Sequence, residues 1–200
     1  MENNWVRLSG KILTKPEFSH KSYGESFYRF TLGAARKSGY IDEIQVMISQ
    51  RLLGKEFPEE GTVASLLGQI RTYNEPTGGK SRLHITAFAR EFQLTGEEAD
   101  DQNQVFLSGF LCKPPIYRKS PMGREICDLL LAVNRMYGKS DYIPCIAWGR
   151  NASYTAGLSV GSPLQAEGRI QSRIYIKKQE SGLSEEKTAY EVSILKIEEQ

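Results

Sequence analysis

The stretch Asn4-Trp-Val-Arg-Leu-Ser-Gly10 recurs 99 residues later as Asn103-Gln-Val-Phe-Leu-Ser-Gly109. The offset of 99 holds through the segments that follow and becomes 100 further along, as one small slip in a connecting segment would produce. A period this long exceeds the roughly 20 to 50 residues of solenoid repeats, so each copy is expected to be a complete domain. The sequence therefore predicts a tandem duplication. Its alignment pairs Pro16 with Pro115, Gly24 with Gly123, Leu32 with Leu131, Asp42 with Asp141, Gly68 with Gly168 and Ile70 with Ile170.

The composition of the 200 residues is that of a globular protein, with 40% hydrophobic and 25% charged residues. There is no run of about 18 apolar residues, and Met1 to Asn4 lack the basic and apolar regions of a signal peptide. The three cysteines form no C-x-x-C pair, so we expect small core residues rather than disulfides or a zinc site. These features predict a cytoplasmic protein without membrane segments.

The domain boundary is expected where composition changes. The segment Thr95-Gly-Glu-Glu-Ala-Asp-Asp-Gln102 is polar, acidic and without apolar periodicity, which is typical of a short surface linker. We therefore divide the chain into an N-terminal domain at 1–94, a linker at 95–102 and a C-terminal domain at 103–200.

Within each copy, apolar and polar residues alternate between turns rich in Gly, Pro, Asn and Ser, which predicts short strands. The second copy is expected to have a short helix at Arg150 to Gly157, and the first copy has Arg51 to Phe57 at that place. Five strands with one helix between the third and fourth is the order of an OB barrel. The predicted fold class is therefore all-β, with two tandem five-stranded OB-fold barrels. In the second copy the strands are expected near 103–112, 124–135, 142–149, 163–177 and 187–197.

Charge is distributed unevenly around a formal net value of +2. Residues 103–178 contain eleven Lys or Arg against four Asp or Glu, a local excess of seven. Residues 3–92 contain thirteen basic and nine acidic residues, an excess of four. Acidic residues collect at 97–101 and after 180. The second copy is therefore the better candidate to meet a negatively charged ligand.

Strand parity places large polar and aromatic side chains on faces that the core does not need. On the third strand of the second copy, Tyr142, Pro144, Ile146 and Trp148 alternate with expected core residues, and on the fourth strand Arg169, Gln171, Arg173 and Tyr175 do so. Aromatic rings stack on unpaired bases, and Arg or Lys neutralise phosphates, so this combination indicates single-stranded nucleic acid. The alternative is that these rings fill barrel ends or an interface.

The second copy resembles the bacterial single-stranded DNA-binding protein (SSB) family, whose DNA-binding unit is an OB-fold. The resemblance runs from Asn103-Gln-Val-Phe-Leu-Ser-Gly109 through Leu131-Ala-Val-Asn-Arg-Met-Tyr137 and Asp141-Tyr-Ile-Pro-Cys-Ile-Ala-Trp-Gly-Arg150 to Glu167-Gly-Arg-Ile-Gln-Ser-Arg-Ile-Tyr175. It implies base stacking by Tyr137, Tyr142, Trp148 and Tyr175, and phosphate contacts by Arg118, Arg150 and Arg173. Parity and charge add Arg135, Arg169 and Lys177 to the predicted phosphate contacts.

The first copy keeps the scaffold but not this aromatic platform. At the positions of Tyr142, Trp148 and Tyr175 it has Glu43, Ser49 and Glu75. Possible contacts in this copy are Tyr40, Arg71 and Tyr73. We interpret it as a degraded or differently used binder, and our hypothesis is that the second copy binds while the first extends or assembles the protein.

The predicted function is sequence-independent binding of single-stranded DNA in replication, recombination or repair, by a non-enzymatic, nucleoid-associated protein. The only histidines, His20 and His84, lie far apart in sequence, so we expect neither a metal nor a cofactor. The alternatives are a primosome-type OB-fold that docks replication proteins, with nucleic-acid contact secondary, and a single-stranded RNA binder.

The resemblance also implies assembly. Relatives with two OB-folds per chain form dimers, so we expect a homodimer with four OB-folds, with the first strands at 6–13 and 105–111 as interface elements. Family members recruit replication proteins through an acidic C-terminal tip. Here the sequence ends at Ile194-Leu-Lys-Ile-Glu-Glu-Gln200, close to the last strand, so recruitment by that route is not expected.

Overall fold

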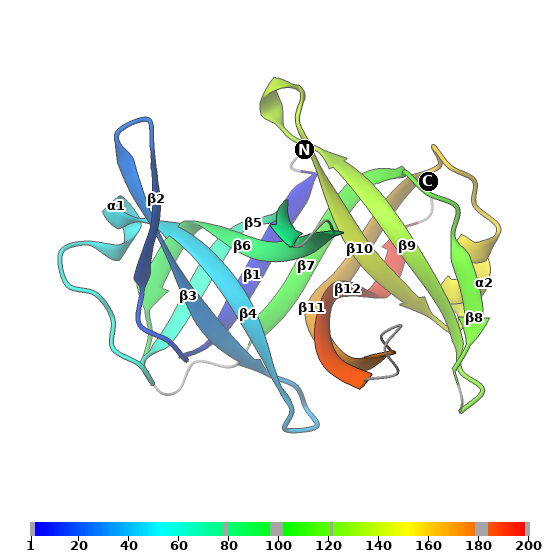
Figure 1. The fold of residues 1–200 in the computed structure, drawn as a ribbon, viewed down its shortest axis with the longest axis horizontal. Helices are drawn as coiled ribbons and strands as arrows, with labels where there is room; N and C mark the ends of the chain where they lie inside the picture. The colour runs from blue at the N-terminus through cyan, green and yellow to red at the C-terminus, as the bar shows by residue number, and fades with distance from the viewer. Residues whose placement is uncertain (1–2, 78–79, 97–101, 121, 179–183, 199–200) are drawn as a thin grey trace.

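The computed structural model describes residues 3–77, 80–96, 102–120, 122–178 and 184–198. They form two β-barrels that lie side by side (Figure 1). The N-terminal barrel consists of β1 (Asn4–Ile12), β2 (Glu17–Ser22), β3 (Glu25–Ala35), β4 (Ile41–Ser49), α1 (Gln50–Leu53), β5 (Val63–Thr77) and β6 (Lys80–Leu94). The C-terminal barrel consists of β7 (Gln102–Leu111), β8 (Ile116–Lys119), β9 (Glu125–Asn134), the 3-10 turn η1 (Met136–Gly138), β10 (Ser140–Trp148), α2 (Arg150–Ala156), β11 (Pro163–Lys178) and β12 (Ser184–Glu198).

The prediction of two tandem OB-folds is confirmed, with a helix between the third and fourth long strands of each copy. Two details differ from the sequence-based expectation. Each barrel has an additional edge strand, β2 or β8, paired only with the strand that follows it in the chain. The helix expected at 51–57 is only α1, a single turn that ends at Gly54, where φ is +79°. The acidic part of the predicted linker, residues 97–101, lies outside the described residues.

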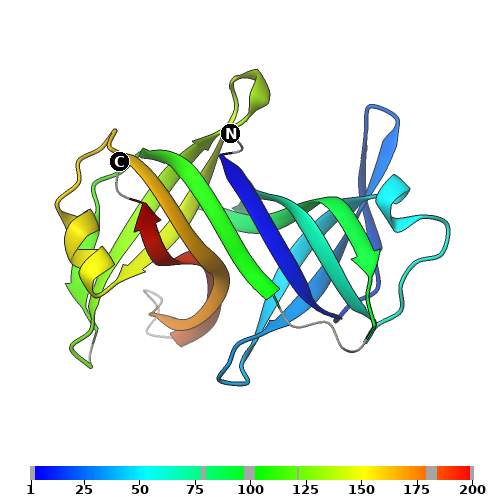
Figure 2. The same ribbon diagram turned by 180° about the vertical axis from the view of Figure 1, so that it is seen from behind.

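The two barrels share one continuous sheet because residues 4–9 of β1 pair with residues 102–107 of β7. The register is antiparallel and places Val6 opposite Val105, which is its own equivalent in the repeat. The two copies are therefore related by a pseudo-two-fold axis at this pair. Figure 2 shows β1 in blue and β7 in green next to each other at the centre of the molecule.

The repeated motif explains how each barrel closes. Its Asn side chain extends the ladder beyond the last β1–β5 pair: Asn4 donates to the carbonyl of Ile70 at 2.8 Å and accepts from its N–H at 2.9 Å. Asn103 makes the same two bonds to Ile170, at 2.7 and 2.9 Å. The Val and Leu of the motif are buried in both cores. The closing Gly lies under the backbone of a crossing strand, since a Cβ on Gly10 would sit 1.9 Å from the carbonyl oxygen of Gly33.

The cores are apolar, and both consist of side chains from the inner faces of all long strands. Cys127 and Cys145 are buried there as free thiols, and burial raises the pKa of both. Among the described residues no helix is long and apolar enough to span a membrane. Within the same residues no group of three or more His, Cys, Asp or Glu is placed to hold a metal ion.

Candidate nucleic-acid interface

Strand β10 carries two of the predicted stacking residues on its outer face. Its inner face is formed by Ile143, Cys145 and Ala147, which are buried in the core as the alternation predicts. Tyr142 points outward and is 48% exposed. Trp148, at the end of the strand, is half-buried, and its indole N–H donates to the Ser193 hydroxyl on β12 at 3.1 Å. The Tyr142 ring is therefore exposed to a ligand, while the Trp148 ring is held by its hydrogen bond to β12.

Tyr137 lies in η1, the turn between β9 and β10, which extends beyond the barrel in Figure 1. Its φ of +64° is in the left-handed region, which is uncommon for a residue with a Cβ. Its side chain is 92% exposed. It lines a hollow together with Lys139, Arg135 and Arg71, so the ring borders basic side chains from both barrels.

Tyr175 and Arg173 lie two residues apart on the outer face of β11. The Tyr175 ring is 37% exposed, and the guanidinium carbon of Arg173 lies 5.8 Å from its centroid. Arg173 Nε also contacts Glu191 Oε1 at 3.4 Å. The cation and the ring are thus presented together, which suits a ligand with both a phosphate and a flat base.

These two side chains line a groove of about 440 Å³ between the barrels. The C-terminal barrel contributes Arg173, Tyr175 and Tyr190, and the N-terminal barrel contributes Arg82 and His84. The predicted interface is therefore not confined to one barrel, because its fourth-strand residues face the hairpin of the other copy.

The remaining predicted cations differ in their surroundings. Arg118, on β8, forms a two-pronged pair with Asp128, with distances of 2.7 and 3.1 Å, and this hydrogen bonding raises its pKa. Arg150 begins α2 and is exposed. Arg169 is half-buried, and its Nε is buried with no hydrogen-bond partner among the described residues. The side chain of Lys177 lies outside the described residues.

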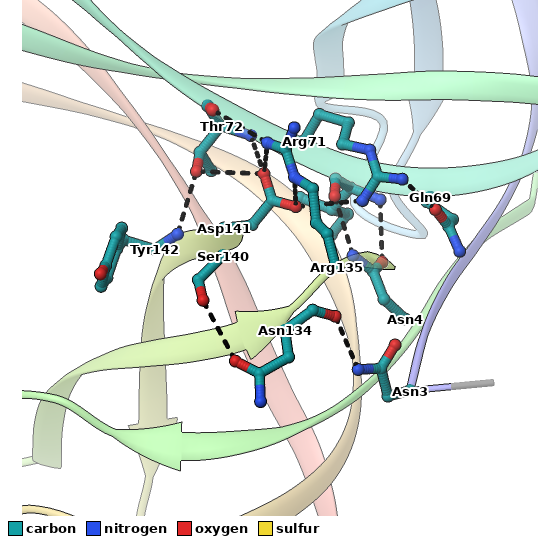
Figure 3. A network of polar contacts seen from close by, with 11 residues as sticks. Asn3, Asn4, Gln69, Arg71, Thr72, Asn134, Arg135, Ser140, Asp141 and Tyr142 are labelled. Carbon is teal, nitrogen blue, oxygen red and sulfur yellow. Dashed lines mark hydrogen bonds and ion pairs between the residues drawn. The ribbon is translucent and has the colours of Figure 1, made fainter. Parts of the chain in front are cut away.

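Arg135 is engaged in a contact between the barrels. Its guanidinium Nε lies 2.5 Å from Oδ2 of the fully buried Asp141, and its Nη2 donates to the Thr72 carbonyl of the N-terminal barrel at 3.4 Å. Asp141 also accepts from the Thr72 N–H at 2.6 Å and pairs with Arg71 at 3.1 Å (Figure 3). Burial lowers the pKa of Arg71, with Asp141 opposing that shift.

The pseudo-two-fold axis repeats this arrangement with Arg36 and Asp42. Asp42 Oδ1 accepts from the N–H of Ser172 at 2.8 Å and from its hydroxyl at 2.9 Å. Arg36 pairs with Asp42 at 2.6 Å and donates to the Ser172 carbonyl at 2.9 Å. Burial favours a higher pKa for Asp42, but the hydrogen bonds from Arg36 and Ser172 outweigh it and hold the pKa below its usual value. Each barrel thus inserts one carboxylate against the other barrel's backbone.

The three predicted contacts of the N-terminal barrel lie in different surroundings. Tyr40 lies under the Arg36 guanidinium, 4.5 Å from ring centroid to carbon, and its hydroxyl is 3.3 Å from that of Ser172. Arg71 belongs to the Asp141 network. Tyr73 is 50% exposed and stacks on His84, with centroids 4.9 Å apart. Only Tyr73 presents a side chain that the inter-barrel networks do not use.

Residues 102–199 match the Single-strand binding protein family. This match covers the whole C-terminal barrel, which is therefore a domain of the SSB family. The chain is 37% identical over 84 residues to "Single-stranded DNA-binding protein A" of Bacillus subtilis (strain 168), covering 38% of this chain and 49% of that protein. It is 39% identical over 80 residues to "Single-stranded DNA-binding protein 1" of Staphylococcus aureus (strain COL), covering 36% of this chain and 48% of that protein. The chain spans about half the length of the curated relatives it matches.

The whole chain, including the N-terminal barrel, is similar in fold to a known crystal structure. The wild-type single-stranded DNA binding protein from Thermus aquaticus matches with a TM-score of 0.78 over 98% of this chain and 92% of that chain. The sequence identity is 20%, so this similarity establishes the arrangement of two OB-folds and nothing about residues.

Reasoning from the sequence did not predict the two carboxylate networks. The signal for them was present, because Arg36 and Asp42 align with Arg135 and Asp141 at the offset of 99. The alternation of side chains along the third strand also predicted Ile146 on the outer face with Tyr142, yet Ile146 is fully buried. Alternation on one strand shows which side a residue faces, but not what covers that side.

Proposed function

We propose that this protein binds single-stranded DNA without sequence preference and without catalysing a reaction, in replication, recombination or repair. The observation that carries the proposal is that the barrel matching the SSB family has exposed rings at Tyr137, Tyr142 and Tyr175, a half-buried Trp148 and exposed cations. The similar proteins of Bacillus subtilis and Staphylococcus aureus are single-stranded DNA-binding proteins by name, which supports the choice of ligand. The cytoplasmic, nucleoid-associated location stays a prediction.

In this proposal the rings stack on bases and the cations contact phosphates. Tyr175 and Tyr142 are exposed enough to stack directly, and Tyr137 would reach a base from its turn. Arg118, Arg150, Arg169, Arg173 and Lys177 remain as proposed phosphate contacts. We remove Arg135 from this set, because Asp141 and the Thr72 carbonyl occupy its guanidinium.

A competition titration at several salt concentrations tests this function. The probe is oligo-dT, with oligo-U and duplex DNA as competitors. A site that neutralises about five phosphates on a single strand is expected to show a log–log slope of affinity against salt near roughly −0.7 × 5. A flat salt response, or equal competition by duplex DNA, contradicts the proposal. Preferential competition by oligo-U assigns the site to RNA instead.

We also propose a homodimer, with a changed interface. The first strands were expected at the dimer contact, but β1 and β7 pair with each other inside the chain. Their other edges are also occupied, by β5 and β11. A second copy therefore has no strand edge to extend here and would pack on the outer face of the sheet, where Trp5 and Phe106 stack with centroids 6.2 Å apart.

A further inference from the structure

The N-terminal barrel retains aromatic side chains at the place of Trp148, but they come from other strands. In the C-terminal barrel, β10 and β12 pair in parallel with Ile146 beside Ser193, the residue that holds Trp148. In the N-terminal barrel, β4 and β6 pair in the same way with Met47 beside Phe88. Met47 aligns with Ile146, so Phe88 occupies the position of Ser193. Where one copy has Trp148 and Ser193, the other has Ser49 and Phe88.

Phe88 belongs to a group of three rings, which we call the Phe88 cluster: His20 on β2, Phe27 on β3 and Phe88 on β6. Phe27 lies directly opposite Ser49 in the β3–β4 register, where the small side chain leaves room for it. The Phe27 and Phe88 centroids are 5.7 Å apart, and His20 stacks on Phe27 at 5.1 Å with an interplanar angle of 14°. His20 is exposed, while both Phe rings are half-buried, as Trp148 is.

The cluster lies on the same face of β6 as residues that line the groove between the barrels. Arg82, His84, Thr86 and Phe88 alternate along β6 and therefore share its outer face. His84 stacks on the exposed Tyr73 at an interplanar angle of 8° and also lines the groove that contains Tyr175. Rings thus line the groove from both barrels, at Tyr175 and His84, and Phe88 lies four residues beyond His84 on the same face of β6.

Positive charge accompanies these rings. Arg29 shares the face of Phe27 on β3, and its ion pair with Glu17 spans 3.8 Å between two exposed side chains, which holds it weakly. Arg82 is exposed at the groove and reaches the Thr188 carbonyl at 3.5 Å. Rings that alternate with exposed cations are the chemistry that single-stranded DNA requires.

We propose that the N-terminal barrel is a second base-stacking surface for single-stranded DNA, formed by the Phe88 cluster and the Tyr73–His84 pair. It replaces the stacking positions lost at Glu43, Ser49 and Glu75. This inference rests on the proposed function of the C-terminal barrel and extends the DNA path across both barrels. It replaces the hypothesis that the first copy only extends or assembles the protein.

The test uses the full chain with two lengths of oligo-dT, one of about ten nucleotides, which spans one OB-fold, and one of about thirty, which spans two. The variant Phe88→Leu keeps an apolar side chain of similar reach but removes the ring. We expect it to bind the long oligonucleotide about five- to a hundred-fold more weakly and the short one as the parent does, because the short one occupies the C-terminal barrel. Phe88→Tyr is expected to retain the parent's affinity for both.

Unchanged binding of the long oligonucleotide by Phe88→Leu would overturn the second surface. Failure of the parent to bind either length would instead overturn the proposed function, so the two failures are distinguishable. A second measurement covers the case in which Phe88→Leu does not fold. In a Trp148→Phe background, Phe88→Trp introduces an indole into the cluster, and oligo-dT is expected to quench it beyond the signal of Trp5. Quenching no greater than that of the Trp148→Phe protein contradicts the proposal.

Discussion

The carboxylate of Asp42, in the N-terminal barrel, accepts a 2.8 Å hydrogen bond from the backbone N–H of Ser172, in the C-terminal barrel. Asp141 makes the reciprocal bond to the N–H of Thr72 at 2.6 Å. Both carboxylates have no exposed surface, and each is paired with an Arg of its own barrel. The β1–β7 ladder joins the barrels at one place, and these two contacts fix their relative orientation at two others.

Removing one of these charges is expected to destabilise the protein. Asp42→Asn retains the size of the side chain but leaves Arg36, whose side chain is only 22% exposed, without its ion-pair partner. The cost is expected to be about 3 kcal/mol in the free energy of unfolding, measured by urea denaturation, because a partly desolvated cation loses its counter-charge.

The matched control for that experiment is Asp128→Asn. Asp128 also pairs with an arginine through two hydrogen bonds, but its side chain is 36% exposed. Solvent screens that pair, so the loss should stay below about 1 kcal/mol. Equal losses of unfolding free energy in Asp42→Asn and Asp128→Asn would show that the inter-barrel position of Asp42 does not add to stability.

Protonation of Asp42 at low pH is expected to remove its contribution to stability. Hydrogen bonds from Arg36 and Ser172 lower the pKa of Asp42 in the folded protein, so its ionised form stabilises folding. That stabilisation is fully present above the unfolded-state pKa of about 3.9 and is lost as pH falls from there through the lowered folded pKa. The difference in unfolding free energy between the parent and Asp42→Asn is therefore expected to be constant near neutral pH and to shrink below about pH 4. A difference that stays constant down to pH 3 would contradict this assignment.

The repeat made the double barrel predictable, because equivalent residues make the same local contacts in each copy. Asn4 and Asn103 bond the backbone of Ile70 and Ile170, and Gly10 and Gly109 allow a crossing strand to come close. The targets of Asp42 and Asp141 were not predictable in this way. The motif shows that an Arg and an Asp six residues apart recur, but their target lies on the opposite barrel and depends on the β1–β7 register. That register is a property of the assembled sheet rather than of either copy.

The Phe88 cluster was hidden for a related reason. An alignment at a fixed offset compares each strand only with its equivalent, so Ser49 reads as the loss of Trp148. Phe88, which we propose replaces the ring, lies on β6, 39 residues after Ser49. Only the parallel β4–β6 register brings Phe88 next to the end of β4. The short strands β2 and β8 were not predicted. Each has only four to six residues on an exposed edge, too few to show a clear alternation of apolar and polar side chains.

Tyr175 offers the cleanest test of stacking in the C-terminal barrel, since its ring is partly exposed and lies beside the Arg173 guanidinium. Tyr175→Ala is expected to weaken oligo-dT binding by about 1 to 3 kcal/mol without changing thermal stability, and Tyr175→Phe should retain binding. Fluorescence titration gives both affinities. Tyr154→Ala removes a ring from α2 that is 46% exposed, against 37% for Tyr175, and serves as the control. If the two alanine variants bind alike, Tyr175 does not stack on a base.

The proposed homodimer predicts a specific effect of charge on the outer sheet face. Trp5 and Phe106 stack across the β1–β7 ladder, on the side opposite the cores, so a second copy packed there would bury both rings. Trp5→Glu introduces a charge that such an interface must desolvate, and it should halve the mass measured by light scattering. Tyr23→Glu adds the same charge at the fully exposed β2–β3 turn and should leave the mass unchanged. A parent that is already monomeric, or a Trp5→Glu variant that remains dimeric, would remove this face from the assembly.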